Sequence, residues 1–112
     1  MSVPDSSILR VLRLLDASPP LTQRAMAREL GVSLGKANYC LHALLGKGFV
    51  KVQNFRKSTN KRGYAYLLTP EGVAAKADLT RHFLVRKREE YDALWLEIER
   101  LQRESESAVE VP

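Results

Sequence analysis

The sequence of 112 residues has a single cysteine, Cys40, and no apolar run that approaches the ~18 residues needed to span a bilayer. A lone cysteine excludes an internal disulfide and a Cys-x-x-Cys metal pair, and it fits a reducing compartment. Pro4 and Asp5 stand where a signal peptide would carry positive charge. We therefore expect a cytoplasmic protein that does not enter a membrane.

Acidic residues are absent from positions 30–70, and this stretch carries seven basic ones: Lys36, Lys47, Lys51, Arg56, Lys57, Lys61 and Arg62. Residues 1–72 hold 11 basic and 4 acidic side chains (net +7), whereas residues 73–112 hold 7 and 9 (net −2). Spaced cations without carboxylates suit a polyphosphate backbone, so the composition indicates a nucleic acid as partner. The segregated charge indicates that the two parts of the chain have different roles.

Apolar residues at helical spacing predict three helices in the first part of the chain. The first contains Ile8, Leu9, Val11, Leu12 and Leu15 and stops at Ser18-Pro19-Pro20. The second is capped by Thr22, turns Met26, Ala27 and Leu30 inward, and ends at Gly31. The third is capped by Ser33, turns Ala37, Leu41 and Leu44 inward, and ends at Gly46-Lys47-Gly48. Two short helices joined by so tight a turn predict a helix-turn-helix.

After Gly48 the pattern alternates, with Val50 and Val52 on one side of a strand and Lys51 and Gln53 on the other. A basic segment at 56–63 separates this strand from a second one at 64–68, and the pair predicts a hairpin with a cationic tip, the wing of a winged helix. Thr69-Pro70-Glu71 combines a cap, a first-turn proline and an acid, which predicts a fourth helix from there to about residue 105.

The fourth helix carries an apolar seam with alternating steps of four and three, the heptad pattern of a coiled coil. The seam comprises Val73, Ala77, Thr80, Leu84, Lys87, Tyr91, Leu94, Ile98 and Leu101. We expect a homodimer joined through Leu84, Tyr91, Leu94, Ile98 and Leu101. The alternative is that this helix folds back on its own domain.

The fold class expected is therefore mainly α with a small β hairpin, a winged helix-turn-helix, plus a long C-terminal coiled-coil helix. The expected divisions are a DNA-binding domain at 1–72, a dimerisation helix at 73–106 and a flexible tail at 107–112.

Two segments, SLGKANYCL at 33–41 and YAYLLTPEG at 64–72, carry a family resemblance. The arrangement resembles winged helix-turn-helix repressors of the MarR class, and these segments are similar to the MarR-family regulators associated with exopolysaccharide (EPS) gene clusters in bacteria. The resemblance implies a DNA-binding transcriptional regulator of such genes. Larger MarR proteins have an extra N-terminal helix that completes their effector pocket and that this chain lacks, which leaves a small-molecule effector possible but unsupported.

In helix-turn-helix proteins the second helix of the motif, here the third of the chain, lies in the major groove. Lys36 can donate to guanine, Asn38 can pair with adenine, and Gly35 lets the backbone come close. The wing is expected to reach the flanking DNA. The full set of expected DNA-binding residues is Thr22, Gln23, Ser33, Leu34, Gly35, Lys36, Asn38, Tyr39, His42, Arg56, Lys57, Lys61 and Arg62. The alternatives are that Lys36 and His42 contact only phosphate, that Tyr39 packs on the wing and that Asn38 faces solvent.

Two other classes of function compete with DNA binding. An enzyme is not indicated, because Cys40 and His42 are two apart on a helix and point away from each other, and the sequence around Gly35-Lys36 lacks the spacing of a phosphate loop. No cofactor or metal ion is expected. A winged helix used as a protein-interaction adaptor through its coiled coil is the remaining alternative to a DNA-binding regulator.

Overall fold

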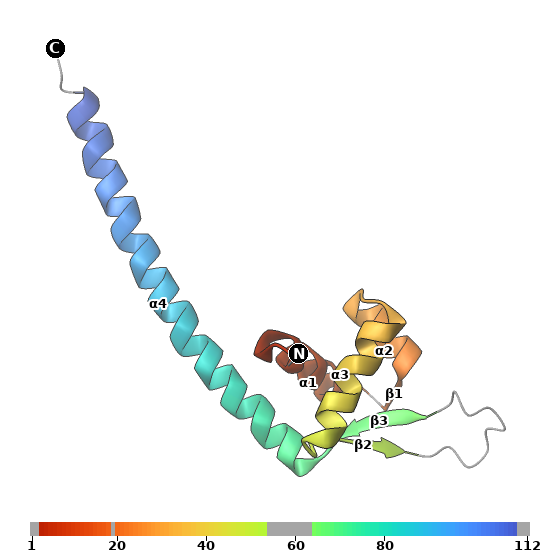
Figure 1. Cartoon of the computed structure of the whole chain (residues 1–112). Helices are drawn as coiled ribbons and strands as arrows, with labels where there is room; N and C mark the ends of the chain where they lie inside the picture. The colour runs from red at the N-terminus through yellow and green to blue at the C-terminus, as the bar shows by residue number, and fades with distance from the viewer. Residues whose placement is uncertain (1–2, 19, 54–63, 110–112) are drawn as a thin grey trace. The chain divides into compact units, whose positions relative to one another are not determined.

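The computed structural model of the chain describes residues 3–18, 20–53 and 64–109. The chain divides into two compact units, Met1–Thr80 and Arg81–Pro112. The first unit contains three short helices, a small sheet and the beginning of a long helix that continues through the second unit (Figure 1). The mainly helical winged-helix architecture predicted from the sequence is confirmed.

Helix α1 (Asp5–Ala17) supplies one wall of the core of the first unit. Its predicted inward residues are all buried: Ile8, Leu9, Val11, Leu12 and Leu15. The helix ends where the sequence predicted, because Ser18 adopts an extended conformation ahead of the two prolines.

Helices α2 (Gln23–Leu30) and α3 (Leu34–Gly46) form the helix-turn-helix. Both begin as predicted, at hydroxyl caps: Thr22 Oγ1 and Ser33 Oγ each accept a hydrogen bond of 3.1 Å from the backbone N–H three residues later. Gly31 takes the left-handed conformation (φ 68°) that ends α2, and Val32 N–H donates back to the carbonyl of Ala27. Three residues thus separate the two helices.

The sheet has three antiparallel strands in the order β1-β3-β2, one more than the sequence predicted. Strands β2 (Val50–Gln53) and β3 (Ala65–Leu68) are the predicted pair, with Val50 opposite Leu68 and Gln53 opposite Ala65. The additional strand, β1 (Leu21–Thr22), lies just before α2 and pairs with β3. The basic segment expected at the tip, 56–63, lies outside the described residues.

Of the two valines expected on one side of β2, only the first is covered. Val50 is 3% exposed and belongs to the core, whereas Val52 is 43% exposed. Val50 lies four residues after the end of α3 and belongs to the same core cluster as Leu41 and Leu44 of that helix, while Val52 lies two residues further along an edge strand. Alternation therefore predicted the strand correctly, and the core extends beneath its first residue only.

The core of the first unit joins α1, α2, α3 and the start of β2. It comprises Ile8, Val11, Leu12, Leu15, Met26, Cys40, Leu41, Leu44 and Val50. Ala75 and Leu79, near the beginning of α4, are partly buried against this cluster. The first turns of α4 thus help to close the domain that carries the helix-turn-helix.

Helix α4 (Pro70–Val109) is a single helix of 40 residues, about 60 Å long at 1.5 Å per residue. Thr69 Oγ1 caps it by accepting from Gly72 N–H at 3.0 Å, and its hydroxyl donates to the Gly48 carbonyl at 2.6 Å. Lys76 Nζ lies 2.6 Å from Asp16 Oδ2 and ties α4 to α1. The helix ends later than the predicted residue 105, so residues 107–109, assigned to a tail, are helical.

No helix among the described residues is both long enough and apolar enough to cross a membrane.

Candidate DNA-binding interface

The face of α3 turned away from the core is formed by Gly35, Asn38, Tyr39 and His42, which follow the i, i+3, i+4, i+7 spacing of one helical stripe. The opposite stripe, Ala37, Cys40, Leu41 and Leu44, is buried. Tyr39 is 49% exposed and Asn38 is half-buried. Burial of one stripe therefore leaves a polar and aromatic stripe, free of carboxylates, on the outer surface of the helix.

The first turn of α3 is the most open part of this face. Leu34 is 46% exposed, and Gly35 and Lys36 are also exposed. A Cβ added at Gly35 would meet no atom within 4 Å. The first turn of a helix has unpaired N–H groups and a partial positive charge. Lys36 adds a full positive charge, so this end of α3 attracts anions. Ser33 Oγ is already occupied as the cap.

Two of the residues expected to bind DNA, Thr22 and Gln23, also have local partners. Thr22 Oγ1 caps α2, and Gln23 Nε2 donates to the carbonyl of Leu34 at 3.3 Å. The second bond joins the first turn of α2 to the first turn of α3 across the helix-turn-helix. Gln23 therefore helps to fix the position of α3.

Arg10 has a similar positioning role that the sequence analysis missed. Its Nη2 donates to the carbonyl of Leu30 at 2.9 Å, at the C-terminal end of α2. A guanidinium is favourable there because carbonyls at the end of a helix lack helical partners and carry partial negative charge. No local sequence signal indicates this bond, since the partners are 20 residues apart.

Tyr39 and His42 also line a shallow hollow between α1 and α3. Val3, Asp5 and Ile8 contribute to it from α1 and the residues before it, and Lys47 contributes from the end of α3. Asp5 is an acid at the edge of an otherwise acid-free surface. The second half of α3 is thus in a different environment from its open first turn.

The wing residues proposed to contact DNA, Arg56, Lys57, Lys61 and Arg62, lie outside the described residues. Near the described ends of the hairpin, the exposed residues are Lys51, Val52, Gln53 and Tyr64.

The seam residues expected to join two subunits are exposed on α4. Leu84, Tyr91, Leu94, Ile98 and Leu101 are between 44% and 67% exposed. Trp95, which the sequence analysis left out, is 50% exposed and lines a shallow apolar hollow with Tyr91, Leu94 and Ile98. Lys87, the charged member of the seam, lies with its Nζ 3.1 Å from Glu90 Oε2.

Within the described parts of the chain, no three His, Cys, Asp or Glu side chains come together as a metal-binding group. The geometry on the surface is therefore that of a binding face with an exposed helix, and the described residues form no cluster typical of metal-assisted catalysis.

Comparison with known proteins agrees with this geometry. Residues 4–51 match the family described as winged helix-turn-helix DNA-binding. The transcriptional repressor CouR, solved on a 23-mer DNA duplex, is 28% identical, with a TM-score of 0.65 over 90% of this chain and 70% of that one. No curated protein sequence matches the chain.

Two further solved structures share the fold. Streptococcus pneumoniae FabT in complex with DNA is 20% identical, with a TM-score of 0.60 over 91% of this chain and 76% of that one. Staphylococcus aureus MarR in complex with salicylate and kanamycin is 17% identical, with a TM-score of 0.63 over 95% and 74%. Residues 4–51 are therefore similar to winged helix-turn-helix DNA-binding domains, and the fold of the chain matches that of solved MarR-family proteins.

Proposed function

We propose that the protein is a sequence-specific, double-stranded DNA-binding transcriptional regulator that acts as a homodimer. The observation that carries the proposal is the exposed, carboxylate-free face of α3 with its open first turn, in a chain that is 28% identical to a repressor solved on DNA. The alternative function, a protein-interaction adaptor, would not require such a face.

In the proposed complex α3 lies in the major groove with its first turn toward the base edges. Lys36 donates to guanine O6 or N7, and Asn38 pairs with an adenine edge. Leu34 contacts a thymine methyl, and Gly35 allows the helix backbone to approach the DNA closely. Tyr39 and His42 follow on the same face, where the Tyr39 hydroxyl and a ring nitrogen of His42 reach bases or phosphates.

The wing supplies affinity in this proposal. Arg56, Lys57, Lys61 and Arg62 form a basic segment with no acid among them, and they bind the phosphates or minor groove beside the site read by α3. Thr22 and Gln23 flank the same surface at the start of α2, where they offer hydroxyl and amide donors to a phosphate.

The target genes are proposed from the sequence resemblance. The segments at 33–41 and 64–72 are similar to those of MarR-family regulators associated with exopolysaccharide clusters, so we propose exopolysaccharide biosynthesis genes as targets. DNA from the neighbourhood of the gene itself is therefore the first probe to use.

The test replaces the two proposed base readers. Lys36→Ala and Asn38→Ala should each weaken binding to the cognate operator by about 1–3 kcal/mol and should weaken binding to random DNA much less. Band shifts on both DNAs measure this difference. Arg103→Ala, which removes one charge from an exposed position of α4, is the control and should bind as the wild type does.

Thermal melting of each variant accompanies the band shifts, because half-buried Asn38 lies next to buried Ala37. If both variants stay folded and lose the same affinity for every DNA, α3 contacts phosphates only and the proposed readout is wrong.

A further inference from the structure

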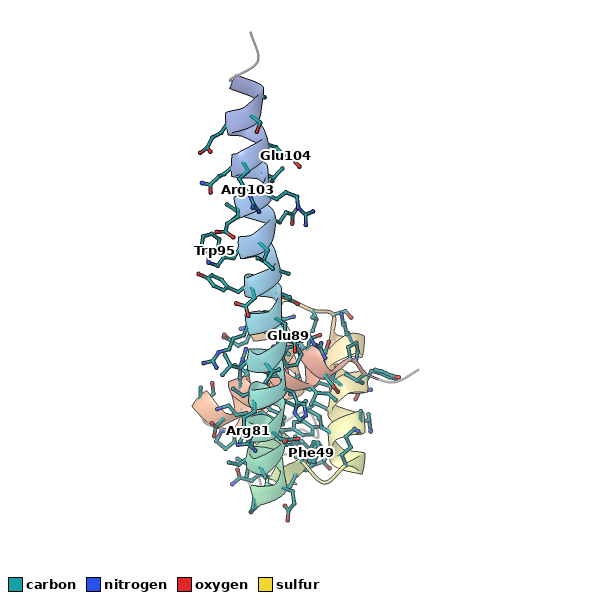
Figure 2. All side chains as sticks on the ribbon, turned by 90° about the vertical axis from the view of Figure 1, so that its left-hand side faces the viewer. Phe49, Arg81, Glu89, Trp95, Arg103 and Glu104 are labelled. Carbon is teal, nitrogen blue, oxygen red and sulfur yellow. The ribbon has the colours of Figure 1, made fainter. Side chains whose placement is uncertain are left out.

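The second unit of the chain has an apolar stripe flanked by two rows of residues that differ sharply in charge. One flank consists of the residues that directly precede seam positions 84, 91, 98 and 105, and these are Phe83, Glu90, Glu97 and Glu104. The other flank consists of the residues that directly follow seam positions 87, 94 and 101, and these are Arg88, Trp95 and Gln102. We call these the acidic row and the mixed row. Figure 2 shows one member of each, Glu104 and Trp95, projecting to opposite sides of α4.

We propose that two copies of α4 pair in parallel and in register through the seam Tyr91, Leu94, Ile98 and Leu101. This inference rests on the proposed homodimer and adds the orientation of its helices. The occupant of the exposed seam is thus a second copy of this chain, and the argument for its direction is charge complementarity between the two rows.

In a parallel pair each acidic-row residue meets the mixed-row residue five positions later in the second copy. Glu90 then faces Trp95, whose indole N–H is a donor for its carboxylate, and Glu97 faces Gln102, whose amide is also a donor. Phe83 faces Arg88, a cation over an aromatic ring. All three contacts are favourable, and each occurs twice in a two-fold dimer.

In an antiparallel pair the acidic row of one helix lies beside the acidic row of the other, and the mixed row lies beside the mixed row, whatever the register. The acidic row then places glutamates opposite glutamates along its whole length from Glu90 to Glu104. These side chains are exposed and carry the same charge, so the contact is repulsive. The rows therefore select the parallel arrangement.

Lys87 is the residue that opposes this arrangement, because parallel pairing brings it near the like-charged Lys87 of the second copy. Its ammonium lies 3.1 Å from Glu90 Oε2 within the same helix, which directs the charge of Lys87 to the flank of the seam. Lys87 interrupts the apolar seam between Leu84 and Tyr91, so the packing of the two helices is loosest there. In each copy the helix-turn-helix precedes the seam in the chain, so parallel pairing puts both DNA-binding domains at the same end.

Disulfide cross-linking of variants with one added cysteine tests the orientation. Leu94→Cys and Leu101→Cys change seam residues that are exposed in the single chain, and Ser105→Cys changes a small residue in the next layer of the same seam. A disulfide needs Cα atoms about 5.5–6 Å apart. The wild type, with Cys40 buried, reports background cross-linking.

A parallel, in-register pair predicts that all three variants form covalent dimers under mild oxidation in more than half of the chains. An antiparallel pair brings identical positions together only at its centre, so at most one variant would cross-link, and this result would overturn the proposal. Sedimentation of the wild type distinguishes the possible failures: a dimer with one cross-link refutes the orientation alone, whereas a monomer refutes the assembly as well. Neither outcome bears on DNA binding by α3, which band shifts measure separately.

Discussion

Gly72 is the most closely surrounded of the glycines that the structure describes. It is buried in the first turn of α4, and a Cβ at this position would overlap the carbonyl oxygen of Phe49, with the Leu68 side chain 3.1 Å away. The same carbonyl accepts a hydrogen bond of 3.1 Å from Thr69 N–H. Phe49 and Gly72 therefore set how closely α4 approaches the backbone between α3 and β2.

Gly72→Ala should lower the free energy of unfolding by about 1–3 kcal/mol, because a methyl group cannot enter this contact without moving backbone. Urea unfolding measures the change. Gly35→Ala is the matched control: its Cβ is unobstructed and its φ is negative, so it should raise stability by up to about 1 kcal/mol.

The Gly35→Ala control also tests the proposed close approach of α3 to DNA, because it should bind operator more weakly although it is more stable. A Gly72→Ala protein as stable as the wild type would contradict the packing described for the junction of α3 and α4.

At the scale of single residues, sequence reasoning found signals that act locally and missed those that act at a distance. Thr22, Ser33 and Thr69 were predicted as caps, and each accepts the expected N–H because capping depends only on the next three residues. The bonds of Gln23 and Arg10 and the crowding at Gly72 depend on segments brought together by folding. Trp95 was missed because only the seam positions were counted.

Among the elements, those with a clear periodicity were predicted and those without it were not. Helices α1, α2 and α3 have an apolar stripe and a stop signal, so their ends were placed correctly. Strand β1 has two residues, too few for any alternation, and was missed. The end of α4 was placed too early because no glycine or proline stands between residue 105 and Pro112 to mark a stop.

The wing is the element whose proposed role can be separated from that of α3. Replacing Arg56, Lys57, Lys61 and Arg62 with Ala should weaken binding to operator and random DNA alike. Each phosphate contact that is lost should lower the slope of log K against log salt by about one. Band shifts over a salt series measure both effects, with Arg100→Ala/Arg103→Ala as a control outside the wing. An unchanged slope and an affinity within about twofold of wild type would refute the proposed phosphate contacts.

For the whole molecule, the proposed dimer depends on the seam of α4. Ile98→Lys should give monomers, because burying an unpaired ammonium costs several kcal/mol. Leu96→Lys is the matched control, since Leu96 is 63% exposed on the same helix but lies off the seam and should leave the dimer intact. Sedimentation velocity measures the assembly, and a dimer in both variants would show that the seam is not the interface.

The central claim is that this molecule reads a DNA sequence as a two-fold dimer. The most direct measurement is selection of bound fragments from a library of genomic DNA, followed by footprinting of the fragments recovered. The account predicts fragments that share an inverted repeat, with half-sites about one helical turn (~34 Å) or a multiple of it apart, bound at least about 10³-fold more tightly than random DNA. Recovery of fragments with no common sequence, or of a single unrepeated half-site, would contradict it.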